Sequence, residues 1–481
     1  MEILAIIIAL SIATISSLVL KRRVLIETVT IIASSVALIS SLLIAFKVSS
    51  DGVYKLSSFF TVDALSAIVI IIIGFIGFAS TIYSLQYLRQ ETSKEIIGFT
   101  RVKQYFVLLN LFLMAMFLAI SASSPIFAWI AIEATTLSTA FLISFYNKPS
   151  TIEAAWKYLI INSIGLLFGF FGTILYFTAF ESTSEIGLVT WQLLSSNAIY
   201  LDPLLAKVAF IFVLIGYGTK VGLVPMHTWK PDTYSKAPAP LGALLSGALL
   251  PVAFVMILKF KLITDSVVGA DFSQHLLIAF GALSVAVAAL ILFNAQNYKR
   301  LLAYSSIEHA GIMALGFAFG GIAIYAAVLH LIYHSCIKAS LFFASGNIML
   351  TYNSAKIYNV RGALSVIPIT SAIFILGALA ITGTPPFGMF FTKMYILTTG
   401  MEHYPVITTI VLFFMAIVFI GFLKHLTAMF FGDKPEDIHA RGLSMWLMIP
   451  PFFFLIIMIV LSFYIPPFLL DLINDVVSQY K

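Results

Sequence analysis

The amino-acid sequence predicts an all-α, polytopic membrane protein with about fourteen transmembrane helices. Of its 481 residues, 61% are hydrophobic and only 10% are charged, whereas a soluble domain carries roughly 25% charged residues. The mean hydropathy is +1.05. Apolar runs of about 20 residues, the length that crosses a bilayer, recur along the whole chain. No soluble fold buries this much apolar surface, so the solvent of most of the chain is lipid.

Short loops separate the predicted spans and hold most of the charged residues. The first span is followed, not preceded, by Lys21, Arg22 and Arg23. This order is the reverse of a signal peptide, so we expect the first span to be retained. The approximate limits of the spans are 2–20, 24–46, 64–85, 104–121, 125–146, 158–180, 203–225, 238–258, 274–293, 301–319, 322–348, 364–400, 404–428 and 443–467.

The basic residues are distributed unequally between the two sides of the predicted bundle. Most of the 27 lysines and arginines lie in loops that follow odd-numbered spans. Because positively charged loops stay on the cytoplasmic side of a membrane, both termini are predicted to lie outside. Their spread over many short loops does not suggest a nucleic-acid partner. The opposite side holds Lys47, Lys55, Lys259, Lys261 and Lys481.

Glu133 lies in the middle of the fifth span, and Lys220 lies inside the seventh. A charged side chain in a span costs about 2.5–3.5 kcal/mol on insertion scales, so such residues are functional candidates. Burial disfavours the protonated form of a lysine, and a nearby carboxylate restores it. A lysine that Glu133 approaches would hold its proton, and one from which it withdraws would release it. The alternative is a buried pair that only fixes helix packing.

The eleventh span carries His330, His334 and Lys338, each four residues after the last. Successive side chains at this spacing turn only about 40° and rise about 6 Å, so the three share one helix face. Histidine titrates near neutral pH and can shuttle protons. The two histidines resemble half of a metal site, but Leu331 stands where a zinc protease has glutamate. With Cys336 as the single cysteine, we expect no metal and no cofactor.

Two spans are predicted to be broken helices. Residues 364–400 are too many for one straight span, and Pro385 and Pro386 interrupt them. Lys393 follows this break within the same span. The seventh span contains three glycines and ends at Pro225, so we expect a second break there.

Five further residues are auxiliary candidates with a structural alternative. His227 and Asp232 follow the seventh span, in a segment that is either the inner mouth of a pathway or a tight turn. Asp232 stands between two prolines and has capping as its alternative role. Glu153 lies one turn before a lysine and predicts an ion pair, with lateral charge relay as the alternative. Glu308 and His309, near the start of the tenth span, are equally ambiguous.

Four ordered segments resemble the antiporter-like proton-channel subunits shared by respiratory complex I, group 4 membrane-bound hydrogenases and Mrp-type cation/proton antiporters. Within that family, residues 129–137 and 153–158 are most similar to the hydrogenase-4 component F type. The resemblance covers the chain after the third span. The four segments are 218–232, 299–307, 330–346 and 383–393.

The resemblance implies two inverted five-helix repeats with broken helices 7 and 12 at equivalent places. Helices 1–3 then occupy residues 1–103, the repeats 104–260 and 261–428, and the last helix 429–481. The resemblance assigns Glu133 and Lys220 as the charged pair of the inner half-channel. It makes Lys338, with His330 and His334, the central relay, and Lys393 the outer gate.

The resemblance also implies a function. It indicates a proton-translocating subunit of a redox complex in a prokaryotic cytoplasmic membrane, with no redox centre of its own. Electron transfer in a peripheral arm would drive it through a neighbouring antiporter-like or quinone-chamber-type subunit. The alternatives are an Mrp-type Na⁺/H⁺ antiporter subunit and a membrane anchor whose channel is inactive.

One departure keeps the inactive-channel alternative open. Many relatives carry a lysine or histidine in the middle of helix 8, where this chain has Pro251. The next basic residue, Lys259, lies near the outer end of the span. The link from the first half-channel to the centre therefore lacks its usual group.

Overall fold

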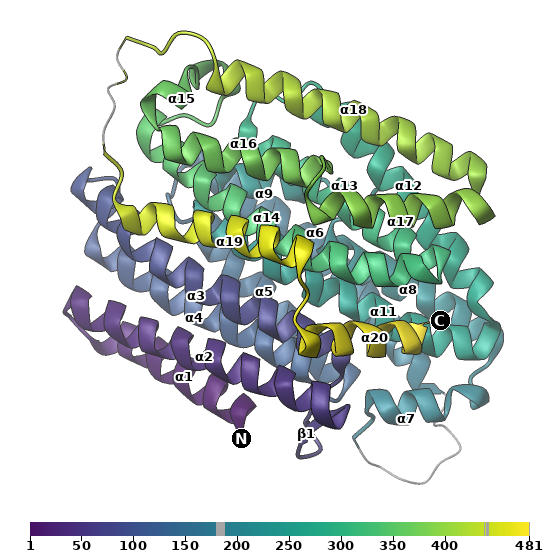
Figure 1. Ribbon diagram of the computed structural model, residues 1–481. Coiled ribbons are helices and arrows are strands. Elements are labelled where there is room, and N and C mark those ends of the chain that lie inside the picture. The colour runs from purple at the N-terminus through teal and green to yellow at the C-terminus, as the bar shows by residue number, and fades with distance from the viewer. Residues whose placement is uncertain (179–187, 437, 439–441, 481) are drawn as a thin grey trace.

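The computed structural model describes residues 1–178, 188–436, 438 and 442–480. Long helices lie side by side along one direction and form a bundle (Figure 1). Within the described ranges, thirteen helices are long and apolar enough to cross a membrane. They are α1 (Glu2–Val19), α2 (Arg23–Asp51), α3 (Ala64–Ser93), α4 (Phe99–Ser121), α5 (Pro125–Ile143), α6 (Pro149–Phe177), α8 (Pro203–Val221), the continuous α10–η3–α11 (Ala239–Val268), α12 (Ala270–Leu292), α13 (Tyr298–Phe319), α14 (Ile322–Tyr352), α18 (Pro405–Phe430) and α19 (Met445–Phe463).

The remaining elements are short, and they include the two halves of the twelfth predicted span. The only strands described, β1 (Tyr54–Leu56) and β2 (Phe60–Val62), pair antiparallel between α2 and α3. The short helices are α7 (Trp191–Ser196), η2 (Ala198–Tyr200), α9 (Trp229–Lys236), η4 (Ile357–Asn359), α15 (Ala363–Val366), α16 (Pro368–Thr382), α17 (Gly388–His403) and α20 (Pro467–Tyr480).

The all-α polytopic prediction is confirmed. Each of the fourteen predicted spans corresponds to a helix or, for residues 364–400, to the pair α16 and α17, which lie end to end beside α18 (Figure 1). Three predicted limits are wrong by eight to ten residues, because α6 begins at Pro149 and not near residue 158, α3 ends at Ser93 and not near 85, and α11 ends at Val268 and not near 258. Proline suits the first helical position, and the Thr151 hydroxyl accepts a hydrogen bond from the Lys148 amide at 3.0 Å. The earlier start places Glu153 and Lys157 inside the helix.

Both predicted helix breaks are present. The helix α8 ends at Val221, followed by Gly222 with φ +82°, and α16 ends at Thr382, followed by Gly383 with φ +85°. Glycine is suited to this left-handed conformation because it lacks a Cβ. The proline of each break lies in the connection to the next helix, α9 or α17. Broken helices leave backbone carbonyls and amides free inside a membrane, where they can hold ions.

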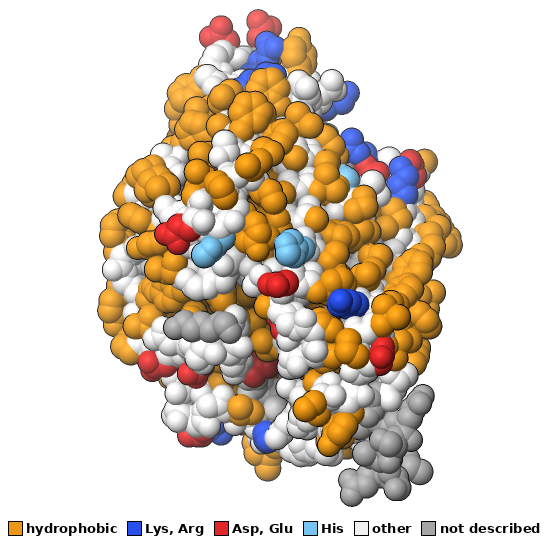
Figure 2. Space-filling view, turned by 90° about the vertical axis from the view of Figure 1, so that its right-hand side faces the viewer, with side chains coloured by type: hydrophobic (Ala, Val, Ile, Leu, Met, Phe, Trp, Pro, Cys, Tyr) orange, Lys and Arg blue, Asp and Glu red, His pale blue; other side chains and the backbone are white. Residues whose placement is uncertain are grey.

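The centre of the bundle is formed by α10–η3–α11, α13 and α14. These helices are almost wholly buried, whereas α1, α18 and α19 bury about a third of their residues or fewer. Hydrophobic side chains dominate the surface in Figure 2, with charged and histidine side chains scattered among them. The central helices also carry Glu308, His309, His330, His334 and Lys338, so these costly groups face protein and not lipid.

Candidate functional site

The first buried group joins α5, α6 and α8 around Lys220. Lys220 is 2% exposed, and its Nζ donates hydrogen bonds to the Thr136 hydroxyl and to the Tyr158 hydroxyl, both at 2.8 Å. The Thr136 hydroxyl in turn donates to Glu133 Oε2 at 3.3 Å, and Ser163 donates to Glu133 Oε1 at 2.7 Å. The structure therefore joins Lys220 to Glu133 through one hydroxyl group and not by direct contact.

This bridge predicts a graded effect of substitutions at Thr136. Thr136→Val keeps the side-chain shape but removes the hydroxyl, and Thr136→Ser keeps the hydroxyl as a matched control. Loss of one hydrogen bond of about 1 kcal/mol slows a transfer step through it about fivefold. We expect proton uptake by vesicles holding the assembled complex to fall by that factor in Thr136→Val and to stay near wild type in Thr136→Ser. Equal rates in the two variants would contradict the bridge.

The end of α8 is held by residues from α9. The Trp229 Nε1 donates to the Thr219 carbonyl at 2.9 Å, and its ring lies 5.1 Å from the Tyr158 ring. Lys230 is fully buried, and its Nζ donates to the Val221 carbonyl at 2.7 Å. The sequence had placed Lys230 in an inner loop as an ordinary basic residue. The structure instead brings it into the protein interior at the break.

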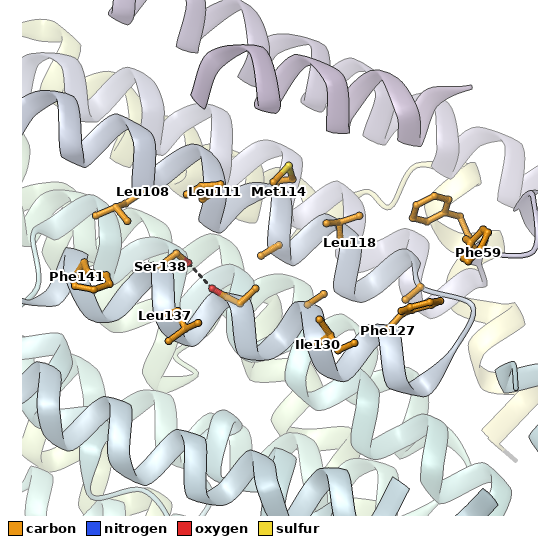
Figure 3. Close-up of a pocket in the computed structure, with 15 residues that line it drawn as sticks. Phe59, Leu108, Leu111, Met114, Leu118, Phe127, Ile130, Leu137, Ser138 and Phe141 are labelled. Atoms are coloured by element: carbon orange, nitrogen blue, oxygen red, sulfur yellow. Dashed lines mark hydrogen bonds between the residues drawn. The ribbon is translucent and has the colours of Figure 1, made fainter. Parts of the chain in front are cut away.

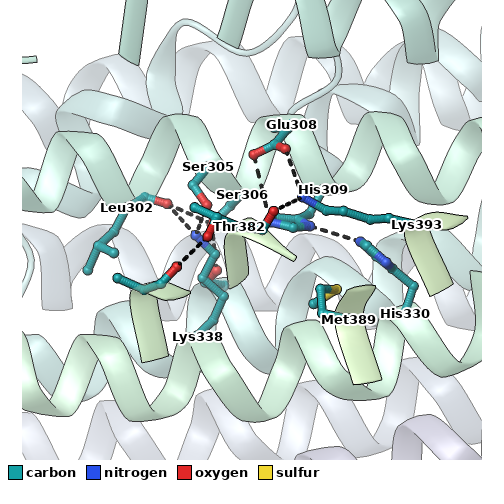
Figure 4. Close-up of polar contacts among 12 residues, drawn as sticks. Leu302, Ser305, Ser306, Glu308, His309, His330, Lys338, Thr382, Met389 and Lys393 are labelled. Atoms are coloured by element: carbon teal, nitrogen blue, oxygen red, sulfur yellow. Dashed lines mark hydrogen bonds and ion pairs between the residues drawn. The ribbon is translucent and has the colours of Figure 1, made fainter. Parts of the chain in front are cut away.

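The central group surrounds Lys338 on α14. Its Nζ donates to the Leu302 carbonyl at 2.7 Å and to the Ser305 hydroxyl at 2.8 Å, and the side chain is fully buried (Figure 4). The Leu302 carbonyl also accepts a hydrogen bond from the Ser306 hydroxyl at 3.0 Å, and that hydroxyl lies 2.8 Å from the Ser246 hydroxyl on η3 (Leu245–Leu249), a π-helical turn. Lys338 thus points toward α13, and the Leu302 carbonyl and two serine hydroxyls connect it to η3.

His309 of α13 forms a hydrogen bond with one histidine of α14, His330, and lies near the other, His334. His309 Nδ1 lies 2.8 Å from His330 Nε2, and His330 Nδ1 lies 2.9 Å from the Thr392 hydroxyl on α17. The His309 ring is 5.5 Å from the His334 ring. Within the described residues, neither ring nitrogen of His334 has a hydrogen-bond partner. His330, His334 and Lys338 share a helix face as predicted, but the hydrogen bonds cross to α13 and α17.

Lys393 is paired with a carboxylate that sequence analysis left ambiguous. Its Nζ lies 3.2 Å from Glu308 Oε1 and 3.2 Å from the Thr382 carbonyl at the end of α16 (Figure 4). Glu308 is 1% exposed, and its other oxygen lies 3.7 Å from His309 Nε2. Glu308 and His309 therefore connect the central group to Lys393.

A network of surface ion pairs joins α6, α9 and α13. Lys157 Nζ lies 2.6 Å from Glu153 and 3.3 Å from Asp232, which also pairs with Arg300. The predicted Glu153–Lys157 pair is confirmed, and the capping role considered for Asp232 is wrong, because its carboxylate binds two cations inside α9. These residues line a polar cavity of about 650 Å³. The sequence predicted no such network, since its members are up to 147 positions apart.

His227, the other auxiliary candidate of this segment, lies between α8 and α9. Its ring lies 6.4 Å from that of Tyr304, which lines the polar cavity. Burial lowers the pKa of His227 below its usual value, against the opposing effect of a backbone hydrogen bond at Pro225. The ring is therefore neutral at pH 7.

Lys259 does not replace the basic residue that many relatives carry where this chain has Pro251. Its Nζ lies 2.8 Å from Asp63 Oδ2, beside the first turn of α3. Burial would raise the pKa of Asp63, but the Lys259 charge and hydrogen bonds outweigh it and lower that pKa. Lys259 thus lies in the middle of α11 (Leu250–Val268), eight residues after Pro251, and pairs with Asp63.

An apolar groove of about 590 Å³ lies between α4 and α5 (Figure 3). Side chains such as Phe59, Met114 and Phe141 line it, and none of the lining residues is ionisable. The groove therefore lies apart from the charged groups described above.

Comparisons with known proteins place these features in one family. Residues 122–421 match the family described as "NADH:quinone oxidoreductase/Mrp antiporter, TM", and residues 49–95 match "NADH-Ubiquinone oxidoreductase (complex I), chain 5 N-terminus". The chain is 35% identical over 413 residues to a hydrogenase-4 component F homolog of Methylacidiphilum infernorum (isolate V4), covering 85% of this chain and 86% of the relative.

Two solved structures share the fold. A chain of the membrane-bound sulfane sulfur reductase, an archaeal respiratory membrane complex, superposes with a TM-score of 0.87 at 22% identity, covering 100% of this chain and 96% of that one. A chain of the Mrp complex from Dietzia sp. DQ12-45-1b superposes with a TM-score of 0.84 at 17% identity, covering 99% and 96%. Both neighbours are subunits of multi-subunit membrane complexes.

Proposed function

The chain belongs to the family of NADH:quinone oxidoreductase and Mrp antiporter membrane subunits, and on this premise we propose that it translocates protons as a subunit of a membrane-bound redox complex. It is a multi-pass, antiporter-like membrane subunit. Similarity to a hydrogenase-4 component F homolog and to a respiratory sulfane sulfur reductase supports a redox-driven complex. Partner subunits, including a neighbouring antiporter-like or quinone-chamber-type subunit, carry the electrons and transmit the drive.

The observation that carries the proposal is a set of polar side chains in hydrogen-bonded groups on α5, α8, α13, α14 and α17, all of them buried except the half-buried Glu133. We call this set the polar axis: Glu133, Thr136, Lys220, Lys338, His309, His330, Glu308 and Lys393. Charged groups this deep in a membrane protein are costly and mark ion or proton pathways. A proton enters near the cavity at Asp232 and passes Lys220, the centre and Lys393. Its passage changes no covalent bond except N–H and O–H bonds.

The carboxylates of the polar axis set which lysine holds a proton. Movement of Glu133 away from Thr136 would remove the nearest negative charge from Lys220 and favour proton release. At the other end, Glu308 Oε1 lies 3.2 Å from Lys393 Nζ. We infer that partner subunits change the distance from Glu133 to Thr136 and the distance from Glu308 to Lys393 during turnover. The excess of basic loop residues supports an orientation with both termini outside.

The second candidate is an Mrp-type Na⁺/H⁺ antiporter subunit, which the structural likeness to the Mrp complex favours. The two candidates differ in the ion that accompanies proton movement. In proteoliposomes that hold the intact complex and the trapped pH dye pyranine, we expect electron transfer to drive proton uptake equally in sodium and in choline buffers. Proton movement that needs an imposed sodium gradient, and no electron transfer, would replace the proposal with the antiporter.

A further inference from the structure

The two helix breaks are built in the same way, each around a lysine. Lys230 Nζ donates to the carbonyl of Val221, the last residue of α8, at 2.7 Å. Lys393 Nζ donates to the carbonyl of Thr382, the last residue of α16, at 3.2 Å. The final carbonyls of a helix lack intrahelical partners and carry partial negative charge, so each break forms a site for an ammonium group.

The glycine that ends each first half-helix leaves room for the stem of its lysine. A Cβ on Gly222 would lie 2.7 Å from Lys230 Cδ, and a Cβ on Gly383 would lie 2.9 Å from Lys393 Cδ. Both distances are shorter than carbon atoms tolerate. At both breaks, a lysine amine binds the last carbonyl of the first half-helix and its stem lies against the glycine that follows. Lys230 is therefore the structural counterpart of Lys393 in the first half of the chain.

The two lysines differ in their counter-charge. Lys393 pairs with Glu308 at 3.2 Å. Lys230 is fully buried, and among the described residues it forms no ion pair, so the Val221 carbonyl is its one hydrogen-bond acceptor. A buried lysine without a carboxylate loses its proton more readily than a paired one. Lys230 therefore caps α8 through its hydrogen bond to Val221 and, without a carboxylate partner, is also suited to carry a proton.

Lys230 also lies between the inner pair and the centre. The adjacent Trp229 packs on Tyr158, which accepts a hydrogen bond from Lys220. On the other side, Lys230 Nζ lies 5.7 Å from the ring of Tyr234, and that ring packs against Phe342 of α14 at 5.5 Å. His334 and Lys338 lie on the same helix as Phe342.

Buried polar atoms without a protein hydrogen-bond partner occur on both α9 and α14. Among the described residues, they include Thr233 Oγ1 and the Tyr234 hydroxyl on α9 and both ring nitrogens of His334 on α14. Buried polar atoms of this kind are normally satisfied by ordered water, which needs two or more of them at each site. These atoms supply polar partners on both sides of the step from Lys230 to α14.

We propose that Lys230 receives the proton from Lys220 and passes it to Lys338, in place of the helix-8 basic residue for which this chain has Pro251. In each step an N–H bond of one ammonium breaks and an N–H bond forms on the next amine, with no net charge created. This inference rests on the proposed function, since it adds a proton-carrying residue to the polar axis.

The test compares two substitutions in the intact complex reconstituted in pyranine-loaded proteoliposomes. Lys230→Gln keeps a hydrogen-bond donor for the Val221 carbonyl but carries no proton. Lys230→Arg keeps both the donors and the positive charge but does not release its proton. We expect both variants to assemble with wild-type yield and melting temperature and to lose at least nine-tenths of electron-driven proton uptake. Lys220→Met, measured in parallel, tests the polar axis itself.

Each outcome separates the inference from the function on which it rests. Loss of uptake in Lys220→Met together with normal uptake in either Lys230 variant would overturn the role of Lys230 and leave the proposed function intact. Normal uptake in Lys220→Met would overturn both. If a Lys230 variant loses yield or melting temperature, proton uptake per assembled complex decides, because a cap of α8 alone would leave that ratio unchanged.

Discussion

Replacing Lys220 with methionine is expected to lower electron-driven proton uptake at least about 100-fold, the lower end of what a positioned proton-transfer group contributes. Methionine matches the length of the lysine stem and suits the buried position near the end of α8. It removes the donor to Thr136 and Tyr158, and so disconnects Glu133 from the rest of the polar axis. The measurement is pyranine fluorescence in proteoliposomes with the intact complex.

A second lysine on the same helix provides the control. Lys207 is exposed on α8 and lies over the ring of Phe272 at 5.6 Å, away from the polar axis. Lys207→Met therefore removes the same charge from the same helix and should leave proton uptake unchanged. Wild-type uptake in Lys220→Met would reject the inner pair. If no substitution along the polar axis alters the ratio of protons to electrons, the chain is an inactive membrane anchor.

The second large effect is expected at the Lys393–Glu308 pair. Removing one partner of a buried ion pair leaves an uncompensated charge and costs about 3–5 kcal/mol. Lys393→Met and Glu308→Gln should each lower the melting temperature of the purified complex and abolish proton uptake. The double variant should regain most of the lost melting temperature, because no buried charge remains unpaired, but should regain no proton uptake.

This double-mutant comparison separates packing from function. If the pair only joins α13 to α17, proton uptake will return with stability in the double variant. If the two single variants have additive effects on melting temperature, the two side chains do not interact as the 3.2 Å contact implies. Glu133→Gln provides a reference for the melting temperature of a variant that loses a carboxylate without breaking an ion pair, since Glu133 is half-buried and forms no direct ion pair.

Local features of the sequence are enough to predict the helices, the two breaks and most of the charged members of the site. Hydropathy and the 3.6-residue helix period act over neighbouring positions, so they located Glu133, Lys220, Lys338 and Lys393 on their helices. Glycine and proline limit the backbone locally, and both breaks occur where these residues stand. The confirmed contact between Glu153 and Lys157 is likewise local, one turn apart on α6.

The contacts between these groups are set by the packing of the helices against one another. Thr136 bridges to Lys220 across 84 positions, and Lys393 reaches Glu308 across 85. His309 of α13 contacts His330 of α14. The side chain of Lys230 is buried and binds the Val221 carbonyl, although its segment has the composition of a polar loop. Such contacts depend on helix rotation and interaxial distance, which side-chain packing along whole helices sets. No local pattern records them, and this is why sequence analysis found the charges but not the connections between them.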